Sequence, residues 1–266
     1  MQEPKNKMAM IMIKKVFLFP AILAAFTAAS CTTHYQVSSV SRQRLVVDSR
    51  YDRQPDAQAA AFLAPYKQKV DSVMCPVMGT SARDMDKYRP ESEISNLLAD
   101  VLMWAGKDYG EKPDFSVYNI GGIRAALSKG TVTYGDINDI APFENKICFL
   151  TMTGQNVLEL FRQIAKRQGE GVSHGVELVI RKDGQLVSAL LFGKPVDPAA
   201  HYRVATIDYV AQGNDGLSAF KDGTDLNSPQ NELDNARFLI MNYFKYMQAQ
   251  GKAVDAQVEG RVRFEQ

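Results

Sequence analysis

The sequence predicts an α+β fold, in which a mixed or antiparallel sheet is flanked by helices. Two short apolar segments, 176–181 and 186–191, are joined by Lys182-Asp183-Gly184, which is typical of a hairpin turn. Segments with helical periodicity cluster together instead of alternating with every strand, as they would in a doubly wound parallel sheet. The chain has 266 residues, 45% of them hydrophobic and 23% charged, which is enough for one sizeable core.

The N-terminus predicts export. Four lysines precede an apolar stretch, Val16 to Ala29, which is about as long as the core of a signal peptide and short for a transmembrane helix. The small residues Ala28-Ala29-Ser30 then stand directly before Cys31, a pattern that resembles a bacterial lipobox. We expect residues 1–30 to be a lipoprotein signal peptide and Cys31 to be lipidated, which predicts a periplasmic or outer-membrane lipoprotein. The alternative is a plain signal peptide followed by an incidental cysteine.

The remainder of the chain divides into a tether and one domain. Residues 31–55 are polar apart from Leu45-Val46-Val47, and we expect them to form a tether with one entering strand. Residues 56–266 are expected to form the folded domain. Its helices are predicted from apolar residues spaced three and four apart. These segments are Asp56–Met74, Glu93–Lys107, Gly154–Arg167 with Thr153 as its cap, and Asn231–Met247.

The strands of the domain are predicted from short runs of β-branched and aromatic residues. Besides the two segments of the hairpin they are Phe115–Tyr118, Lys146–Met152, Tyr202–Ile207 and Val258–Phe264.

Charge and cysteine content narrow the classes of function. The net charge of +1 and the absence of a basic run give no reason to expect a nucleic-acid surface. Cys148 lies in the apolar run Ile147-Cys148-Phe149-Leu150, so a buried free thiol is favoured over a disulfide with Cys75. The sequence contains no CxxC and no cysteine-based zinc pattern.

Three segments combine glycine, a polar group and an aromatic residue in ways that favour a binding site. Residues 119–124 read Asn-Ile-Gly-Gly-Ile-Arg, so the backbone can approach a ligand closely while Arg124 offers donors to a phosphate. Residues 142–145 read Pro-Phe-Glu-Asn, and residues 207–216 lead from a strand into a loop with Asp215 between Asn214 and Gly216. Each segment has a structural alternative: a simple turn, a core phenylalanine, or ordinary turn chemistry.

Taken together, and in this order and spacing, these motifs resemble the C-terminal domain of the 5′-nucleotidase family, which includes UDP-sugar hydrolases and ecto-5′-nucleotidases. The resemblance extends from about Tyr88 to Phe220, with weaker support to Phe264. It implies that two aromatic residues clamp a nucleobase and that two asparagines touch the base edge. The corresponding residues here are Phe143 and Tyr209 for the clamp, and Asn145 and Asn119 for the edge.

The resemblance also implies that Asp215 accepts hydrogen bonds from ribose hydroxyls and that Arg124 binds phosphate. At two positions the chain departs from the family pattern. Tyr209 stands where the family usually has phenylalanine, and Asn214 replaces a glycine, where we expect asparagine to tolerate a positive φ. Arg89 lies near the position of further phosphate-binding arginines, although its register is shifted.

In the family, a domain that binds two metals precedes this one. Two-metal chemistry needs a cluster of His, Asp and Asn ligands. The only histidines here are His34, His174 and His201, and none has a neighbouring ligand at metal spacing. The residues that precede the matching region are also too few for such a domain. We therefore expect no catalytic or metal-binding residue in this chain, and divalent metals only in a separate catalytic partner.

Three functions remain open from the sequence. The first is the nucleotide-binding subunit of a split 5′-nucleotidase-type phosphohydrolase, whose partner is a metallophosphoesterase and whose membrane contact is a lipid on Cys31. The second is a stand-alone lipoprotein that binds nucleotides or nucleosides without hydrolysis. The third is a domain that keeps the fold but binds nothing. Preservation of the clamp, ribose and phosphate residues favours the first two.

Overall fold

The computed structural model describes residues 35–51 and 56–265. The chain divides into two units, residues 1–56 and 57–266, which we consider separately. In the first unit, the described residues form no helix or strand, and Leu45 to Val47 are exposed. The predicted entering strand is therefore wrong, because a strand needs a neighbouring strand to pair its backbone groups. Cys31 and the predicted signal peptide lie outside the described residues.

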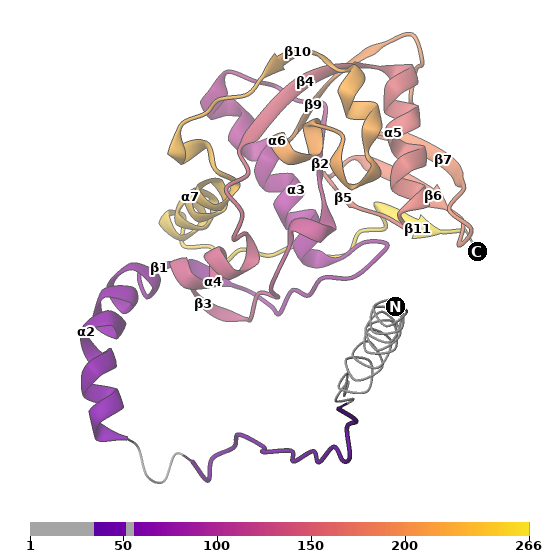
Figure 1. Ribbon diagram of the computed structural model, residues 1–266. Helices are drawn as coiled ribbons and strands as arrows, with labels where there is room; N and C mark the ends of the chain where they lie inside the picture. Colours follow the sequence, from indigo (N-terminus) through magenta and orange to yellow (C-terminus); the bar gives the residue numbers. More distant parts are fainter. Residues whose placement is uncertain (1–34, 52–55, 266) are drawn as a thin grey trace, which may run out of the picture. The chain divides into compact units, whose positions relative to one another are not determined.

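The second unit is organised around a mixed sheet, which among the described residues has five strands in the order β10-β4-β9-β2-β5 (Figure 1). The central strands β9 and β2 run parallel, and the other neighbours are antiparallel. This confirms the predicted α+β class with a mixed sheet. The strands are β2 (Phe115–Tyr118), β4 (Ile147–Thr153), β5 (Gly171–Val172), β9 (His201–Ile207) and β10 (Thr224–Asn227).

Helices α3 (Glu93–Ala105) and α5 (Gly154–Lys166) cover opposite faces of this sheet. Side chains alternate between the faces along a strand. In β2, the ring of Phe115 packs against Phe161 of α5, with 5.4 Å between ring centroids. The next residue, Ser116, donates a hydrogen bond from Oγ to the carbonyl oxygen of Ala99 in α3 at 2.6 Å. The core therefore lies in two layers, one on each side of the sheet.

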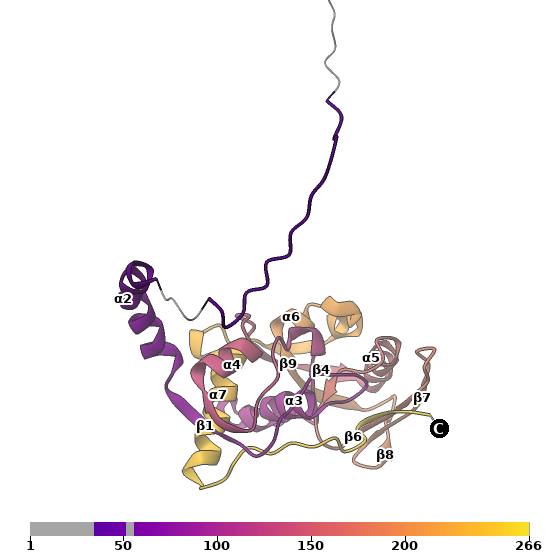
Figure 2. The same cartoon turned by 90° about the horizontal axis from the view of Figure 1, so that it is seen from below.

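A second sheet has, within the described residues, the order β11-β6-β7-β8. The predicted hairpin is confirmed, since β6 (Val176–Ile180) and β7 (Leu186–Leu191) pair antiparallel. Strand β7 contacts α5, and the hairpin extends beside that helix in both views (Figures 1 and 2). The remaining strands are β8 (Lys194–Pro195) and β11 (Val262–Phe264).

A third group of elements comes from residues before β2, between β2 and β4, and after β10. Strands β1 (Val77–Ser81) and β3 (Gly130–Thr133) pair antiparallel, and α7 (Ala236–Ala249) packs against β1 and α3. Helix α4 (Tyr134–Ile140) follows β3 directly. The short helical turns are α6 (Asp208–Ala211), η1 (Gly106–Tyr109), η2 (Ile120–Gly122), η3 (Asn214–Gly216), η4 (Ser218–Asp222) and η5 (Glu232–Asp234).

Helix α2 (Ala57–Met74) begins one residue after Asp56, and it presents its predicted apolar stripe to solvent. None of its residues is buried. The exposed side chains of the stripe are Phe62, Leu63, Tyr66, Val70 and Val73. No helix among residues 35–51 and 56–265 combines the length and the apolar composition needed to cross a bilayer.

Two predicted elements start several residues later in the structure, because polar contacts hold the residues before them. The predicted helix Asn231–Met247 starts only at Ala236, since Asn235 is extended, bridges to Lys146 and caps α7 by accepting from the N–H of Arg237. The predicted strand Val258–Phe264 starts only at Val262. Before that point the backbone N–H of Glu259 donates to Glu91 at 2.7 Å instead of to a strand. The Thr153 cap is confirmed, because its hydroxyl accepts from the N–H of Asn156.

The two described cysteines are both free thiols, one exposed and one buried. Burial raises the pKa of Cys148 to about 12, so this thiol stays protonated at neutral pH. We expect Ellman's reagent at pH 8 to react with Cys75 in the folded protein and to leave Cys148 unmodified until denaturant is added. Peptide mass spectrometry identifies the labelled residue. Fast labelling of Cys148 in the native protein would contradict its burial.

Candidate functional site

A cavity of about 320 Å³ opens at one edge of the mixed sheet. Its position follows from strand direction, because the parallel strands β2 and β9 end at the same edge and the antiparallel strand β4 begins there. The segments that follow β2, precede β4 and follow β9 therefore meet. They supply all the lining residues: Asn119, Gly121, Gly122, Arg124, Phe143, Asn145, Tyr209 and Asp215.

Two aromatic side chains of the cavity are exposed. Phe143 is 47% and Tyr209 is 38% exposed, whereas Phe149, a few residues after Phe143, is completely buried. The two rings line the same cavity, where they remain partly accessible. The guanidinium carbon of Arg124 lies 5.8 Å from the centroid of the Phe143 ring, which is a cation–π distance.

The turn at Asn119–Gly122 requires its glycines. A Cβ atom on Gly122 would lie 2.8 Å from Oδ1 of Asn119, and one on Gly121 would lie 3.2 Å from Oδ2 of Asp215. Side chains at these positions would displace the two polar groups that line the cavity. Glycine therefore brings the backbone close to both Asn119 and Asp215.

Asp215 is held by hydrogen bonds from other lining residues. Its Oδ2 accepts from Nδ2 of Asn119 at 2.7 Å, and its Oδ1 accepts from the hydroxyl of Tyr209 at 3.2 Å. The negative charge of Asp215 raises the pKa of Tyr209, so the phenol remains a donor at neutral pH. Asp215 adopts a left-handed conformation with φ 54° between Gly213 and Gly216, both of which also have positive φ. This backbone is strained for a residue other than glycine.

Asn214, which was expected to tolerate a positive φ, is not among the residues with a positive φ. The positive φ angles of this loop belong to Gly213, Asp215 and Gly216. Asn214 has another role, because its Nδ2 donates to the carbonyl oxygen of Tyr209 at 2.8 Å and closes the loop. Its amide replaces glycine without needing glycine's conformational freedom.

The lining residues of the cavity include every ligand-binding residue that the motifs and the resemblance identified, except Arg89. Nη2 of Arg89 donates to Oε1 of Glu170 at 2.9 Å, and Glu170 is buried. Arg167 donates to the same carboxylate, and its Nη2 lies 3.7 Å from Oδ2 of Asp215. Sequence analysis missed Glu170 and Arg167. Their only signal in the sequence is that Arg167 and Glu170 stand three positions apart just after a predicted helix. This spacing is common in ion pairs at protein surfaces.

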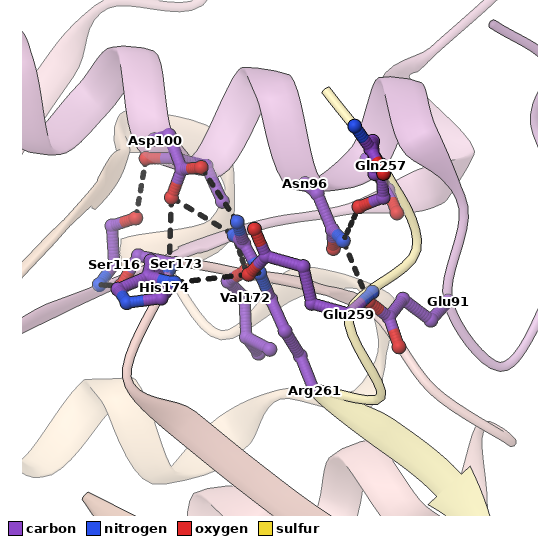
Figure 3. Close-up of polar contacts among 12 residues, drawn as sticks. Glu91, Asn96, Asp100, Ser116, Val172, Ser173, His174, Gln257, Glu259 and Arg261 are labelled. Atoms are coloured by element: carbon purple, nitrogen blue, oxygen red, sulfur yellow. Dashed lines mark hydrogen bonds and ion pairs between the residues drawn. The ribbon is translucent and has the colours of Figure 1, made fainter. Parts of the chain in front are cut away.

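The described residues do not fit a two-metal centre. Among them, no group of three or more His, Cys, Asp and Glu side chains comes together in a way that could hold a metal ion. The one histidine that lies among carboxylates, His174, contacts Glu259 through Nδ1 at 2.9 Å (Figure 3). Between Glu259 and Asp100 lies the guanidinium of Arg261, which donates to both carboxylates. A cationic side chain therefore already satisfies these acids.

The fold is that of an α+β domain with a cavity at the carboxyl ends of its parallel strands. Comparison with known families gives it a more specific assignment: residues 76–222 match the family described as "5′-nucleotidase, C-terminal domain". The match covers more than half of the chain, so the chain belongs to this family.

Curated relatives agree with this assignment. The chain is 28% identical over 163 residues to Protein UshA of Escherichia coli K12, a match that covers 60% of the chain and 30% of UshA. It is 27% identical over 235 residues to Cell wall protein Lmo0130 of Listeria monocytogenes, covering 78% of the chain and 29% of that protein. The matched region is thus less than a third of the length of these relatives.

Solved structures share the fold. A 5′-nucleotidase precursor from Thermus thermophilus superimposes with a TM-score of 0.67 and 25% identity, covering 80% of this chain and 44% of that one. The NAD nucleotidase of Haemophilus influenzae gives a TM-score of 0.59 at 19% identity, covering 79% of this chain and 41% of that one. At that identity, the second comparison concerns the fold alone.

Exposure of the aromatic pair predicts that it contributes little to stability. We expect Phe143→Ala to change the free energy of unfolding by less than about 1 kcal/mol, as is usual at the surface. Phe149→Ala, the matched core control, should cost about 3–5 kcal/mol because it leaves a cavity. Urea unfolding followed by circular dichroism measures both. Equal destabilisation by the two variants would mean that Phe143 is a core residue.

Proposed function

We propose that this chain is the nucleotide-binding subunit of a split 5′-nucleotidase-type phosphohydrolase. In this arrangement it binds the base and the ribose, and a separate metallophosphoesterase supplies the metal ions. The observation on which the proposal rests is the convergence of an exposed aromatic pair, a carboxylate and an arginine on one cavity, in a chain of the 5′-nucleotidase C-terminal domain family.

Phe143 and Tyr209 are proposed to stack on the two faces of a nucleobase. Both rings line the cavity and both are exposed enough to receive a flat ligand. Stacking of a base on one aromatic ring contributes about 1–3 kcal/mol in single-strand binders, so two rings could supply much of the affinity. Asn145 and Asn119 are proposed to contact the base edge.

Asp215 and Arg124 are proposed to bind the ribose and the phosphate. The Asp215 carboxylate receives one hydrogen bond on each oxygen from the protein, and each oxygen keeps acceptor capacity for a sugar hydroxyl. Arg124 lies against the ring of Phe143, from which its guanidinium could turn to a phosphate. Arg89 remains a proposed phosphate contact, although its partner in the structure is Glu170.

The division between two subunits is proposed from the family match, which concerns the C-terminal domain of 5′-nucleotidases. The matched region covers less than a third of the length of relatives such as UshA. We also propose that the protein is exported and attached to a membrane by a lipid on Cys31. The N-terminal sequence pattern and the similarity to a protein named as a cell wall protein support this location.

A second candidate function is stand-alone binding of nucleotides or nucleosides without hydrolysis. One observation favours it: the aromatic pair, the carboxylate and the arginine of the proposed nucleotide site all belong to this chain.

Nucleotide binding is tested by calorimetry with AMP, adenosine and UDP-glucose. We expect the double variant Phe143→Ala, Tyr209→Ala to weaken binding at least about tenfold, because two stacking contacts are lost. Phe62→Ala, which removes an exposed aromatic ring on α2, is the control and should bind like the parent protein. Unchanged affinity in the double variant, or no binding by the parent protein, would contradict the proposal.

The split arrangement is tested by phosphate release from AMP in the presence of divalent metal ions. We expect no hydrolysis by this chain alone, and faster hydrolysis by its mixture with a metallophosphoesterase encoded by a neighbouring gene than by that enzyme alone. Metal-dependent hydrolysis by this chain alone would overturn the division of labour. Binding without any stimulation of the partner would favour the stand-alone function.

A further inference from the structure

A buried carboxylate lies behind the cavity, where it joins two of the segments that form it. Glu170 follows α5, and its side chain is completely buried. Its Oε1 accepts from Nη2 of Arg89 at 2.9 Å and from Nε of Arg167 at 2.5 Å. Its Oε2 accepts from the backbone N–H of Ile120 at 2.6 Å. Neither Glu170, Arg89 nor Arg167 is among the residues that line the cavity.

The arrangement meets the conditions for a buried charge. An ionised carboxylate away from water is costly unless charged partners and hydrogen bonds compensate it, and Glu170 has both. Its bond to Ile120 fixes the turn whose glycines form one wall of the cavity. The position of that turn therefore depends on Glu170.

Arg167 extends this arrangement to Asp215. Its Nε binds Glu170, and its Nη2 lies 3.7 Å from Oδ2 of Asp215. The same Oδ2 accepts from Asn119, the residue directly before Ile120. Glu170 thus connects to Asp215 by two routes, one through Arg167 and one through the Asn119–Ile120 backbone. Asp215 needs such restraint, because it lies in a loop of positive φ angles between glycines.

We infer that Glu170 and Arg167 are positioning residues that hold the Asp215 carboxylate toward the cavity and so set selectivity for ligands with two adjacent hydroxyl groups. This inference rests on the proposed nucleotide-binding function. A carboxylate has acceptor capacity for about four hydrogen bonds. Asn119 and Tyr209 each donate one hydrogen bond, to different oxygens of Asp215. Both oxygens can therefore still accept a hydrogen bond from a vicinal diol. A rotated carboxylate would present only one oxygen to the sugar.

The experiment compares Arg167→Met with Arg162→Met. Both arginines lie in the C-terminal half of α5 or directly after it, but within the described part of the chain Arg162 pairs only with Glu159 at the surface. Removing Arg167 leaves Glu170 paired with Arg89, so the fold is expected to persist. The probes are adenosine and 2′,3′-dideoxyadenosine, whose affinities are measured by calorimetry.

We expect Arg167→Met to weaken adenosine binding about tenfold, as for loss of a charge-assisted contact, and to leave dideoxyadenosine within about twofold. Arg162→Met should change neither. In an Asp215→Asn background, Arg167→Met should have no further effect on adenosine, since the two residues act together. A uniform loss of both ligands, or equal results for Arg167→Met and Arg162→Met, would overturn the inference.

A second measurement does not depend on the ligand. In the nuclear magnetic resonance spectrum of the free protein, Arg167→Met should shift the side-chain amide signals of Asn119, and Glu170→Gln should also shift the backbone amide of Ile120. Arg162→Met should shift neither. If the parent protein binds neither nucleoside, the proposed function fails, and these signals still decide the positioning roles. Unshifted Asn119 signals in Arg167→Met would refute them.

Discussion

The parallel pairing of β2 with β9 is the constraint on which the cavity depends. Phe115 lies opposite Val204 and Ser116 opposite Ala205, and Oγ1 of Thr206 extends the contact by donating to the carbonyl oxygen of Val117. Because the two strands point the same way, the Asn119 turn and the Asp215 loop emerge side by side. Antiparallel pairing of β4 with β9 then brings the Phe143 loop to the same edge. Three segments that are far apart in the sequence thereby form one cavity.

Around this edge, the residues that stabilise the fold differ from those that are proposed to bind the ligand. The core is made of buried apolar side chains on both faces of the sheet, whereas the two aromatic rings of the cavity remain exposed. Strain is located at Asp215, in a loop that the amide of Asn214 closes. The charges behind the cavity are paired around the buried carboxylate of Glu170, and they hold the strained loop against the glycine turn. Rigid support behind an exposed recognition surface is the arrangement expected of a binding site.

Much of the fold could be predicted because its signals are local. The hairpin turn, the Thr153 cap and the strand Phe115–Tyr118 were all predicted from neighbouring residues. The predicted element boundaries are wrong where a residue far away in the sequence forms a hydrogen bond with the backbone. Glu91 accepts from the N–H of Glu259 and delays β11, while the bridge to Lys146 keeps Asn235 extended and delays α7. Propensity cannot anticipate partners that are separated by many residues in the sequence.

The sequence by itself determined the chemistry of the site: an aromatic pair, a carboxylate, an arginine and a glycine turn, each on a recognisable local motif. Only the tertiary structure decided which charges support them. Arg89 and Glu170 are 81 positions apart, and nothing near either residue indicates the other. Their pairing depends on burial, since a carboxylate excluded from water must find its donors wherever the packed chain supplies them. Local motifs specify which groups are available, but the cost of burying charge determines which of them meet.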